Sequence, residues 1–190
     1  MMMSSYSNRQ FVPKQQVIDY ARKMIESDPV YLDTETTGLE SSDEIIEIAI
    51  VNSSGKILLE SFVRPQKPIP ASATAINNIT NIMVANSPSW PEIWPTIRNL
   101  LASHPIGMYN AEFDVRMILQ SMKINRLPDI TRLKAFDVMK IYSDFIHSDR
   151  RYRLEQAGRN LGIEIPNSHR AADDTLLTRA IFHHIAGLPY

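Results

Sequence analysis

A nearly unbroken apolar stretch at residues 44–51 is the clearest pattern in the chain. It reads Glu-Ile-Ile-Glu-Ile-Ala-Ile-Val, which is typical of a strand covered on both faces. A shorter apolar segment at 30–32 precedes it, and residues 56–63 follow it across a polar turn at 52–55. We therefore predict three consecutive strands in an antiparallel meander. Glu47 is a charge inside a core-like strand, either a salt-bridged structural residue or a group supporting a nearby site.

Apolar residues spaced three and four apart predict helices elsewhere. The helix opened by Asn110 as N-cap is expected to bury Val115, Ile118, Leu119 and Met122. Trp90 and Trp94 are interpreted as packing residues rather than base-stacking platforms. The other predicted helices cover 13–26, 71–76, 80–84, 89–102, 138–146, 153–161 and a last segment from after Ser168 to about 186.

Two further strands are predicted at 105–109 and near 134–137, each next to helical segments. Three hairpin strands, a helical crossover and then strand and helix units predict an α/β fold, with a mixed sheet carrying helices on its faces. No internal repeat or interdomain linker is visible. Residues 1–12 are expected to be a mobile N-terminal lead, and residues 13–190 one domain.

Composition narrows the class of protein. Of the 190 residues, 44% are hydrophobic and 22% charged, as in a globular protein, and none is cysteine. Disulfides, thiolate zinc sites and a cysteine nucleophile are thereby excluded. No apolar run approaches the roughly 18 residues of a membrane helix, and the polar start lacks the apolar core of a secretory signal. A cytoplasmic location without membrane association is therefore expected.

Charge is unevenly distributed along the chain. Residues 1–115 carry 8 basic and 13 acidic residues, whereas residues 116–190 carry 12 basic and 8 acidic ones, for a net charge of −1. Divalent cations bound to a group of acids would make the protein positive overall. Such a protein is compatible with a polyanionic substrate. The basic cluster Arg150, Arg151 and Arg153 is either a solvated helix start or a guide for a phosphate backbone.

The acids that suggest chemistry first are Asp33 and Glu35. In an extended chain, residues two apart point to the same face, so both carboxylates aim at one place. Such a pair requires protons or metal ions to offset the repulsion, and hard cations such as Mg²⁺ take oxygen ligands of this kind. The Thr-Thr-Gly that follows suits close approach of a phosphate. A strand end with solvated acids is the other interpretation.

Two later segments turn this pair into a larger pattern. In order, the chain contains Asp33-x-Glu35-Thr-Thr-Gly-Leu, Asn110-x-x-Phe113-Asp114 and His169-x(4)-Asp174. This set resembles the three motifs of the DnaQ-like 3′-5′ exonucleases. The match is to the DEDDh branch, which includes DNA polymerase proofreading subunits, RNase T and oligoribonuclease. The resemblance spans about residue 30 to residue 186.

The resemblance implies a ribonuclease H-like fold, a five-stranded sheet in the order 3-2-1-4-5 with strand 2 antiparallel and helices on both faces. It implies that Asp33, Glu35, Asp114 and Asp174 hold two divalent metal ions, Mg²⁺ or Mn²⁺. It also implies His169 as general base, and it implies that Thr36, Leu39 and Phe113 bind the 3′-terminal nucleotide. Neighbouring helix residues point about 100° apart, so Asp173 and Asp174 compete for one ligand position. Only the family spacing from His169 selects Asp174.

The function implied is metal-dependent hydrolysis of single-stranded DNA or RNA from the 3′ end, releasing nucleoside 5′-monophosphates. Such an enzyme binds nucleic-acid 3′ ends and can work in DNA repair or proofreading; a DNA polymerase partner and a homodimer are left open. One alternative is a ribonuclease H-like endonuclease, which His169 five residues before Asp174 disfavours. The other is a catalytically silent module that binds nucleic-acid ends or a polymerase, which the complete catalytic set disfavours.

One departure from the pattern concerns a turn. Relatives often carry His-Gly-Ile-Thr where this chain has Asn77-Asn78-Ile79-Thr80. Asn tolerates a positive φ better than other non-glycine residues, so the turn is expected to survive. A nucleotide contact made by the family's histidine is in doubt.

Overall fold

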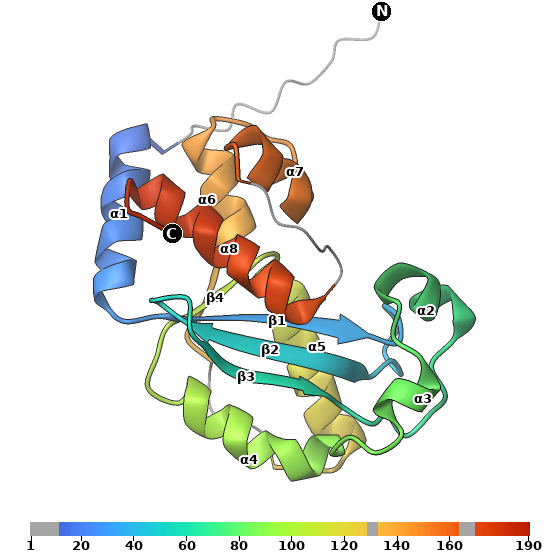
Figure 1. Ribbon diagram of the computed structural model, residues 1–190. Coiled ribbons are helices and arrows are strands. Elements are labelled where there is room, and N and C mark those ends of the chain that lie inside the picture. The colour runs from blue at the N-terminus through green and yellow to red at the C-terminus, as the bar shows by residue number, and fades with distance from the viewer. Residues whose placement is uncertain (1–11, 129–132, 164–169) are drawn as a thin grey trace, which may run out of the picture.

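The computed structural model describes residues 12–128, 133–163 and 170–190. Its centre is one five-stranded sheet in the order β3-β2-β1-β4-β5, of which Figure 1 labels β1 to β4. β1 runs antiparallel to β2 and β2 antiparallel to β3, whereas β4 is parallel to β1 and β5 parallel to β4. The predicted order and the meander are confirmed. The strands are β1 (Val30–Thr36), β2 (Ile45–Asn52), β3 (Ile57–Phe62), β4 (Ile106–Met108) and β5 (Ala135–Asp137).

β1 is the middle strand, and its pairing with β2 is much longer than its pairing with β4. It pairs with β2 along its whole length, from Val30 opposite Asn52 to Glu35 opposite Glu47. On its other side the pairing with β4 covers only Val30 and Tyr31. The second half of β1 therefore runs past the short strand β4. Its side chains lie at an end of the sheet where other segments can approach them.

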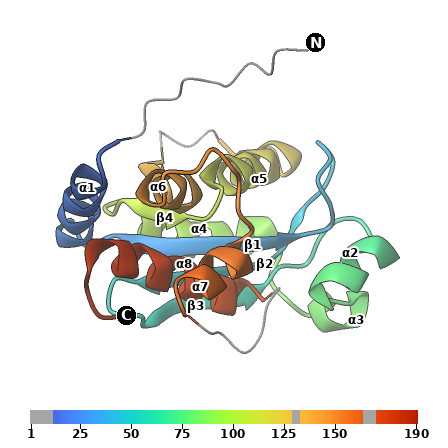
Figure 2. The same cartoon turned by 90° about the horizontal axis from the view of Figure 1, so that it is seen from above.

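Helices cover both faces of the sheet, as predicted. Their bounds are α1 (Lys14–Glu26), α2 (Ala71–Asn77), α3 (Asn81–Val84), α4 (Trp90–Leu101), α5 (Ala111–Ile124), α6 (Val138–Phe145), α7 (Leu154–Asn160) and α8 (Ala171–Ala186). Figure 2 shows α5 and α8 on opposite sides of β1. Among the described residues no helix is long and apolar enough to cross a lipid bilayer.

The alternation of β1 divides the core into two parts. Val30 and Leu32 pack with α4 and α5, where Trp90 and Trp94 stack with ring centroids 5.6 Å apart. Tyr31 points to the other face and packs with α1, α6, α7 and α8. Residues that continue this alternation therefore face α5 if even-numbered and α8 if odd-numbered. The interpretation of the tryptophans as packing residues is confirmed.

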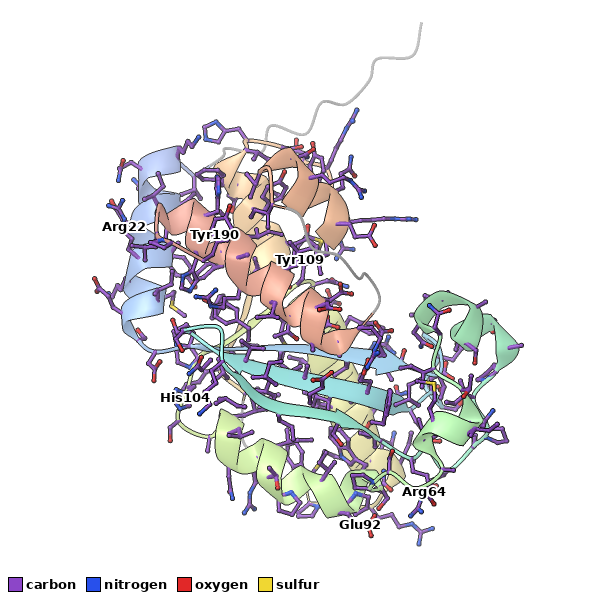
Figure 3. The ribbon with its side chains drawn as sticks, viewed as in Figure 1. Arg22, Arg64, Glu92, His104, Tyr109 and Tyr190 are labelled. Atoms are coloured by element: carbon purple, nitrogen blue, oxygen red, sulfur yellow. The ribbon has the colours of Figure 1, made fainter. Side chains whose placement is uncertain are left out.

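α8 is anchored at its C-terminal end by α1. The Arg22 side chain donates a hydrogen bond of 2.8 Å to the carbonyl oxygen of Ala186, and Figure 3 shows Arg22 beside this end of the helix. Gly187 ends the helix with a left-handed φ of 69°. α8 contacts both β1 and β2. At its N-terminal end the backbone N–H of Ala171 donates a hydrogen bond to Glu47 of β2.

Two details of α5 differ from the prediction. Asn110 precedes the helix, but its backbone is left-handed with φ 66° and its side chain does not cap the helix. Its Oδ1 atom instead accepts a hydrogen bond from Arg151. Leu119 is 43% exposed although the helical pattern predicted it as buried. The sheet and α4 cover only the side of α5 that carries Ile118 and Met122.

Candidate active site

Three carboxylates from two distant segments meet at the second half of β1. Asp33 and Glu35 lie on the α8 side of the strand, and Asp174 comes from the first turn of α8. One carboxylate oxygen from each lies within 4.8 Å of the others. β1 and α8 are separated by more than 130 residues, so the sheet and the packing of α8 create this carboxylate group. Among the described residues, the group contains Asp174 and not Asp173.

Asp114 approaches from the opposite face of the sheet. It lies in the first turn of α5 and is 2% exposed. Its Oδ1 atom accepts a hydrogen bond of 2.8 Å from the hydroxyl of Thr34, the residue between Asp33 and Glu35. The structure thus gives Asp114 a neutral partner and places it outside the three-carboxylate group. Its negative charge still raises the pKa of Asp33.

Burial and mutual repulsion both raise the pKa values of these acids. Desolvation is the largest cause for Asp33, followed by the charges of Asp114 and Asp174, and its pKa lies well above the ordinary value. Desolvation and the charge of Asp174 raise the pKa of Glu35 to about 7. Burial raises that of Asp114 to about 7 even though the bond from Thr34 lowers it. The site favours protons or cations because unpaired charges are costly there.

Glu47 connects the site to α8. It lies opposite Glu35 in the β1–β2 register and is 1% exposed. Its carboxylate accepts hydrogen bonds from the Arg170 guanidinium at 2.7 and 3.1 Å and from the backbone N–H of Ala171 at 3.1 Å. Glu47 is therefore salt-bridged, which was one of the two interpretations of the sequence, and its charge also raises the pKa of Glu35. The contacts fix the start of α8 beside β2.

Comparisons with known proteins identify the family of the chain. The family model RNase_T, described as Exonuclease, matches residues 30–182. The chain belongs to this exonuclease family. It is 34% identical to an uncharacterized exonuclease, CP81, of Escherichia phage 186, over 87% of this chain and 92% of that protein. It spans only 11% of a PolC-type DNA polymerase III from Caldanaerobacter subterraneus.

Solved structures show the same fold. Exonuclease X in complex with 5′ overhanging duplex DNA is 30% identical, with a TM-score of 0.63 over 84% of this chain and 93% of that chain. The nuclease domain of 3′hExo, described as a DEDDh family member, has a TM-score of 0.71 at 17% identity, over 82% of this chain and 89% of that one. The resemblance to DEDDh exonucleases and the ribonuclease H-like fold are thereby confirmed.

The carboxylate group of this exonuclease fits a hard divalent cation. All its ligand atoms are oxygens, which Mg²⁺ and Mn²⁺ prefer. Desolvation, and after it the charges of neighbouring acids, raises the pKa values of Asp33 and Glu35, and a bound cation would offset both effects. Asp33, Glu35 and Asp174 are the described residues that could share an ion.

Three predicted substrate contacts border the acids of the exonuclease. Thr36 ends β1 and is 9% exposed, and its hydroxyl donates to the carbonyl of Gly38. Leu39 is 71% exposed, and Phe113 is half-buried next to Asp114. Thr36 is thus buried, whereas Leu39 offers an exposed apolar surface.

Asn77 is a residue near the site to which the sequence assigned no role. Its side chain donates to the carbonyl of Thr36 at 3.3 Å and accepts from the N–H of Ile79 at 3.0 Å. A hydrogen bond from Asn77 also lowers the pKa of Glu35. The only available signal was its place in the Asn77-Asn78-Ile79-Thr80 segment. Asn78 has φ 60°, so the turn survives as predicted.

The expected general base, His169, lies outside the described residues, as does the predicted start of the last helix at 169. The first described residue after that gap is Arg170, which the salt bridge to Glu47 holds at the start of α8. His183, in contrast, is buried at the far end of α8, where its Nδ1 atom contacts the carbonyl of Pro189 at 3.1 Å. It belongs to the packing of the C-terminal residues.

Proposed function

We propose that this chain is a metal-dependent 3′-5′ exonuclease. It hydrolyses phosphodiester bonds of single-stranded DNA or RNA from the 3′ end and releases nucleoside 5′-monophosphates. The observation that supports this best is the meeting of Asp33, Glu35 and Asp174 within 4.8 Å in a chain of the exonuclease family. Such groups of acids are what phosphodiester hydrolysis by metal ions requires.

Two divalent cations, Mg²⁺ or Mn²⁺, are the cofactors of this proposal. Asp33, Glu35 and Asp174 would hold them, and Asp114 would complete the ligand set. When bound, the ions supply activation of a water nucleophile and stabilisation of the leaving oxygen. Glu35 and Asp114 have raised pKa values of about 7 each, so both lose their protons near neutral pH. The ionised carboxylates can then bind cations.

The remaining roles belong to the chain's other residues. His169 would accept the proton of the attacking water, because imidazole titrates near neutral pH. Leu39, which is 71% exposed, would pack against the terminal base, with Phe113 on the α5 side. Backbone groups at Thr36 would contact the terminal sugar. The Glu47–Arg170 pair would hold the first turn of α8, and with it Asp174, near β1.

A gel time course tests the proposal directly. DNA and RNA strands of equal sequence, labelled at the 5′ end, are incubated with Mg²⁺, with Mn²⁺ and with chelator. A metal-dependent ladder that shortens from the 3′ end is expected, and the faster substrate defines the preference. Internal cuts without a ladder would instead indicate an endonuclease. Intact strands with a mobility shift would indicate a silent binding module.

A further inference from the structure

Two adjoining hollows lie along α5. The larger has a volume of about 1100 Å³ and extends along α5 to Lys123 and Arg126. The smaller has a volume of about 210 Å³ and is lined by Phe113 and Arg151. Both are lined by Arg116, so they form one continuous surface. We call this surface the α5 groove.

The α5 groove is strongly cationic within a chain of net charge −1. Its charged lining residues are four cations and one acid, Glu112; the cations are Arg116, Lys123, Arg126 and Arg151. The carboxylate group is the opposite in sign. The groove therefore attracts a polyanion by itself. Metal ions are needed only at the carboxylate group, where they offset its negative charge.

Two of the cations are already held in position. Arg116 donates to the carbonyl of Leu39 at 3.2 Å, and its guanidinium lies 5.3 Å from the centre of the Phe113 ring. Arg151 donates to Asn110 at 3.0 Å. A guanidinium has five N–H donors, so both groups keep donors for a phosphate. Because their partners include Leu39 and Phe113, the groove begins at the proposed contacts of the 3′-terminal nucleotide.

Apolar side chains lie between the cations. Leu119 is 43% exposed and lines the larger hollow together with Leu127. The helical pattern predicted Leu119 as buried, so its exposure is a property of the folded surface. Cations next to apolar or aromatic surface are what proteins use to bind single-stranded nucleic acid, through the phosphates and the base faces respectively.

We propose that the α5 groove binds the part of the substrate strand upstream of its 3′ end. This inference rests on the proposed exonuclease function and extends it. From Glu112 to Lys123 the helix rises about 16 Å, which corresponds to about five stacked nucleotides at 3.4 Å each. Strands of three nucleotides end within the smaller hollow, whereas strands of twelve reach Lys123 and Arg126. Affinity therefore increases with strand length.

Equilibrium binding of oligothymidylates with a 5′ fluorophore tests the groove. The parent protein is the Asp33→Ala variant, which prevents cleavage, and the test variant adds Lys123→Gln and Arg126→Gln. For the twelve-nucleotide strand, the affinity is expected to fall about 10- to 30-fold at 100 mM salt. The slope of log K against log salt is expected to drop by about 1.4, or about 0.7 for Lys123→Gln alone. The affinity for the three-nucleotide strand stays within about twofold.

The matched control carries Lys23→Gln and Arg98→Gln, which remove the same charge from exposed positions on α1 and α4. It is expected to bind like the parent. An unchanged affinity and salt slope in the groove variant would overturn the proposal. An equal loss in the control, or with the three-nucleotide strand, would overturn it too. The gel time course on the wild-type chain decides the exonuclease activity separately, so either proposal can fail alone.

Discussion

At the scale of single residues, the site is a group of acids that the fold buries close together, which costs desolvation and charge repulsion when they are ionised. Asp33, Glu35 and Asp114 all have raised pKa values, and burial is the largest cause each time. The folded, metal-free protein therefore binds more protons than the unfolded chain between about pH 4 and 7. Its stability falls as the pH rises through that range.

Replacing Asp33 by Asn should stabilise the metal-free protein. The substitution removes a buried carboxyl whose ionised form is disfavoured by desolvation and by repulsion from Asp114 and Asp174. The gain grows with pH, so the comparison is made at pH 8. We expect the unfolding temperature in chelator to rise by about 3–6 °C, the effect of one to two kcal/mol in a chain of this size. Thermal unfolding measures it, with Asp19→Asn on the exposed side of α1 as control. A lower unfolding temperature would contradict the proposed repulsion.

Asp33→Ala is the corresponding test of activity. Asp33 has a carboxylate oxygen within 4.8 Å of those of both Glu35 and Asp174, so its loss removes one of the three carboxylates that could hold an ion. We expect no detectable ladder in the gel time course and an unchanged circular dichroism spectrum. Turnover at the wild-type rate would remove Asp33 from the metal site.

His169→Ala tests the general base. The family spacing, five residues before Asp174, supports this role. We expect the rate at saturating metal to fall by about 10²–10⁴-fold, the usual contribution of acid–base catalysis, and the rate to lose its rise with pH between about 6 and 8. His184→Gln, near the other end of α8, is the matched control. Wild-type turnover in His169→Ala would exclude the residue from the mechanism.

At the scale of elements, the contact that matters most is that between β2 and the start of α8. Glu47 lies opposite Glu35 in the β1–β2 register, and its carboxylate accepts hydrogen bonds from the side chain of Arg170 and the N–H of Ala171. An acid at a helix N-terminus is also favoured by the helix dipole. The position of Asp174, one turn later, follows from this contact.

Glu47→Ala should therefore destabilise the fold and weaken the site together. It leaves Arg170 without its bidentate partner and the start of α8 without an acceptor. We expect the free energy of unfolding, measured by urea denaturation, to fall by about 2–3 kcal/mol. This is less than for a fully buried pair, because Glu47 is buried whereas Arg170 is partly exposed. The metal concentration for half-maximal activity should rise as well.

The matched control for this pair is Glu60→Ala. Glu60 approaches the same Arg170 at 3.9 Å, but its side chain is 43% exposed. Its loss should cost under about 1 kcal/mol, as for surface ion pairs. If Glu47→Ala costs no more than Glu60→Ala, the Glu47–Arg170 pair does not hold α8.

At the scale of the whole molecule, metal binding and folding are linked through the site. Cations bind ionised carboxylates, so metal binding releases the protons that the metal-free site holds. The pKa values of about 7 at Glu35 and Asp114 place this competition near neutral pH.

Mn²⁺ should accordingly raise the unfolding temperature more at pH 8 than at pH 6. At pH 6 part of the acids are protonated, and this weakens the binding of Mn²⁺. At pH 8 the acids are more fully ionised, and bound Mn²⁺ also relieves the repulsion between their carboxylates. Thermal unfolding with and without about 5 mM Mn²⁺ measures the difference. Asp33→Ala should show little shift at either pH. A larger shift at pH 6 in the wild-type chain would contradict the linkage.

Much of this architecture was already determined by the sequence itself. The β-branched run of β2, the alternation of Asp33 and Glu35 and the helical stripes depend on local periodicity, which one segment carries alone. The order of the three motifs was enough to predict the sheet order through the family resemblance. The Glu47 salt bridge was predicted as one of two interpretations, and its partner Arg170 lies 123 residues away.

Without the family resemblance, only the tertiary structure decides which of these residues meet. Helical periodicity does not separate Asp173 from Asp174, because each lines up with apolar residues further along the helix. The family spacing from His169 selected Asp174, and the packing of α8 on β1 and β2 places its carboxylate beside those of Asp33 and Glu35. The helical stripe predicts Leu119 as buried, but the sheet covers only one side of α5 and leaves this residue in the groove. Local patterns determine the elements, whereas burial, pairing and charge at a site depend on contacts between segments far apart in the chain.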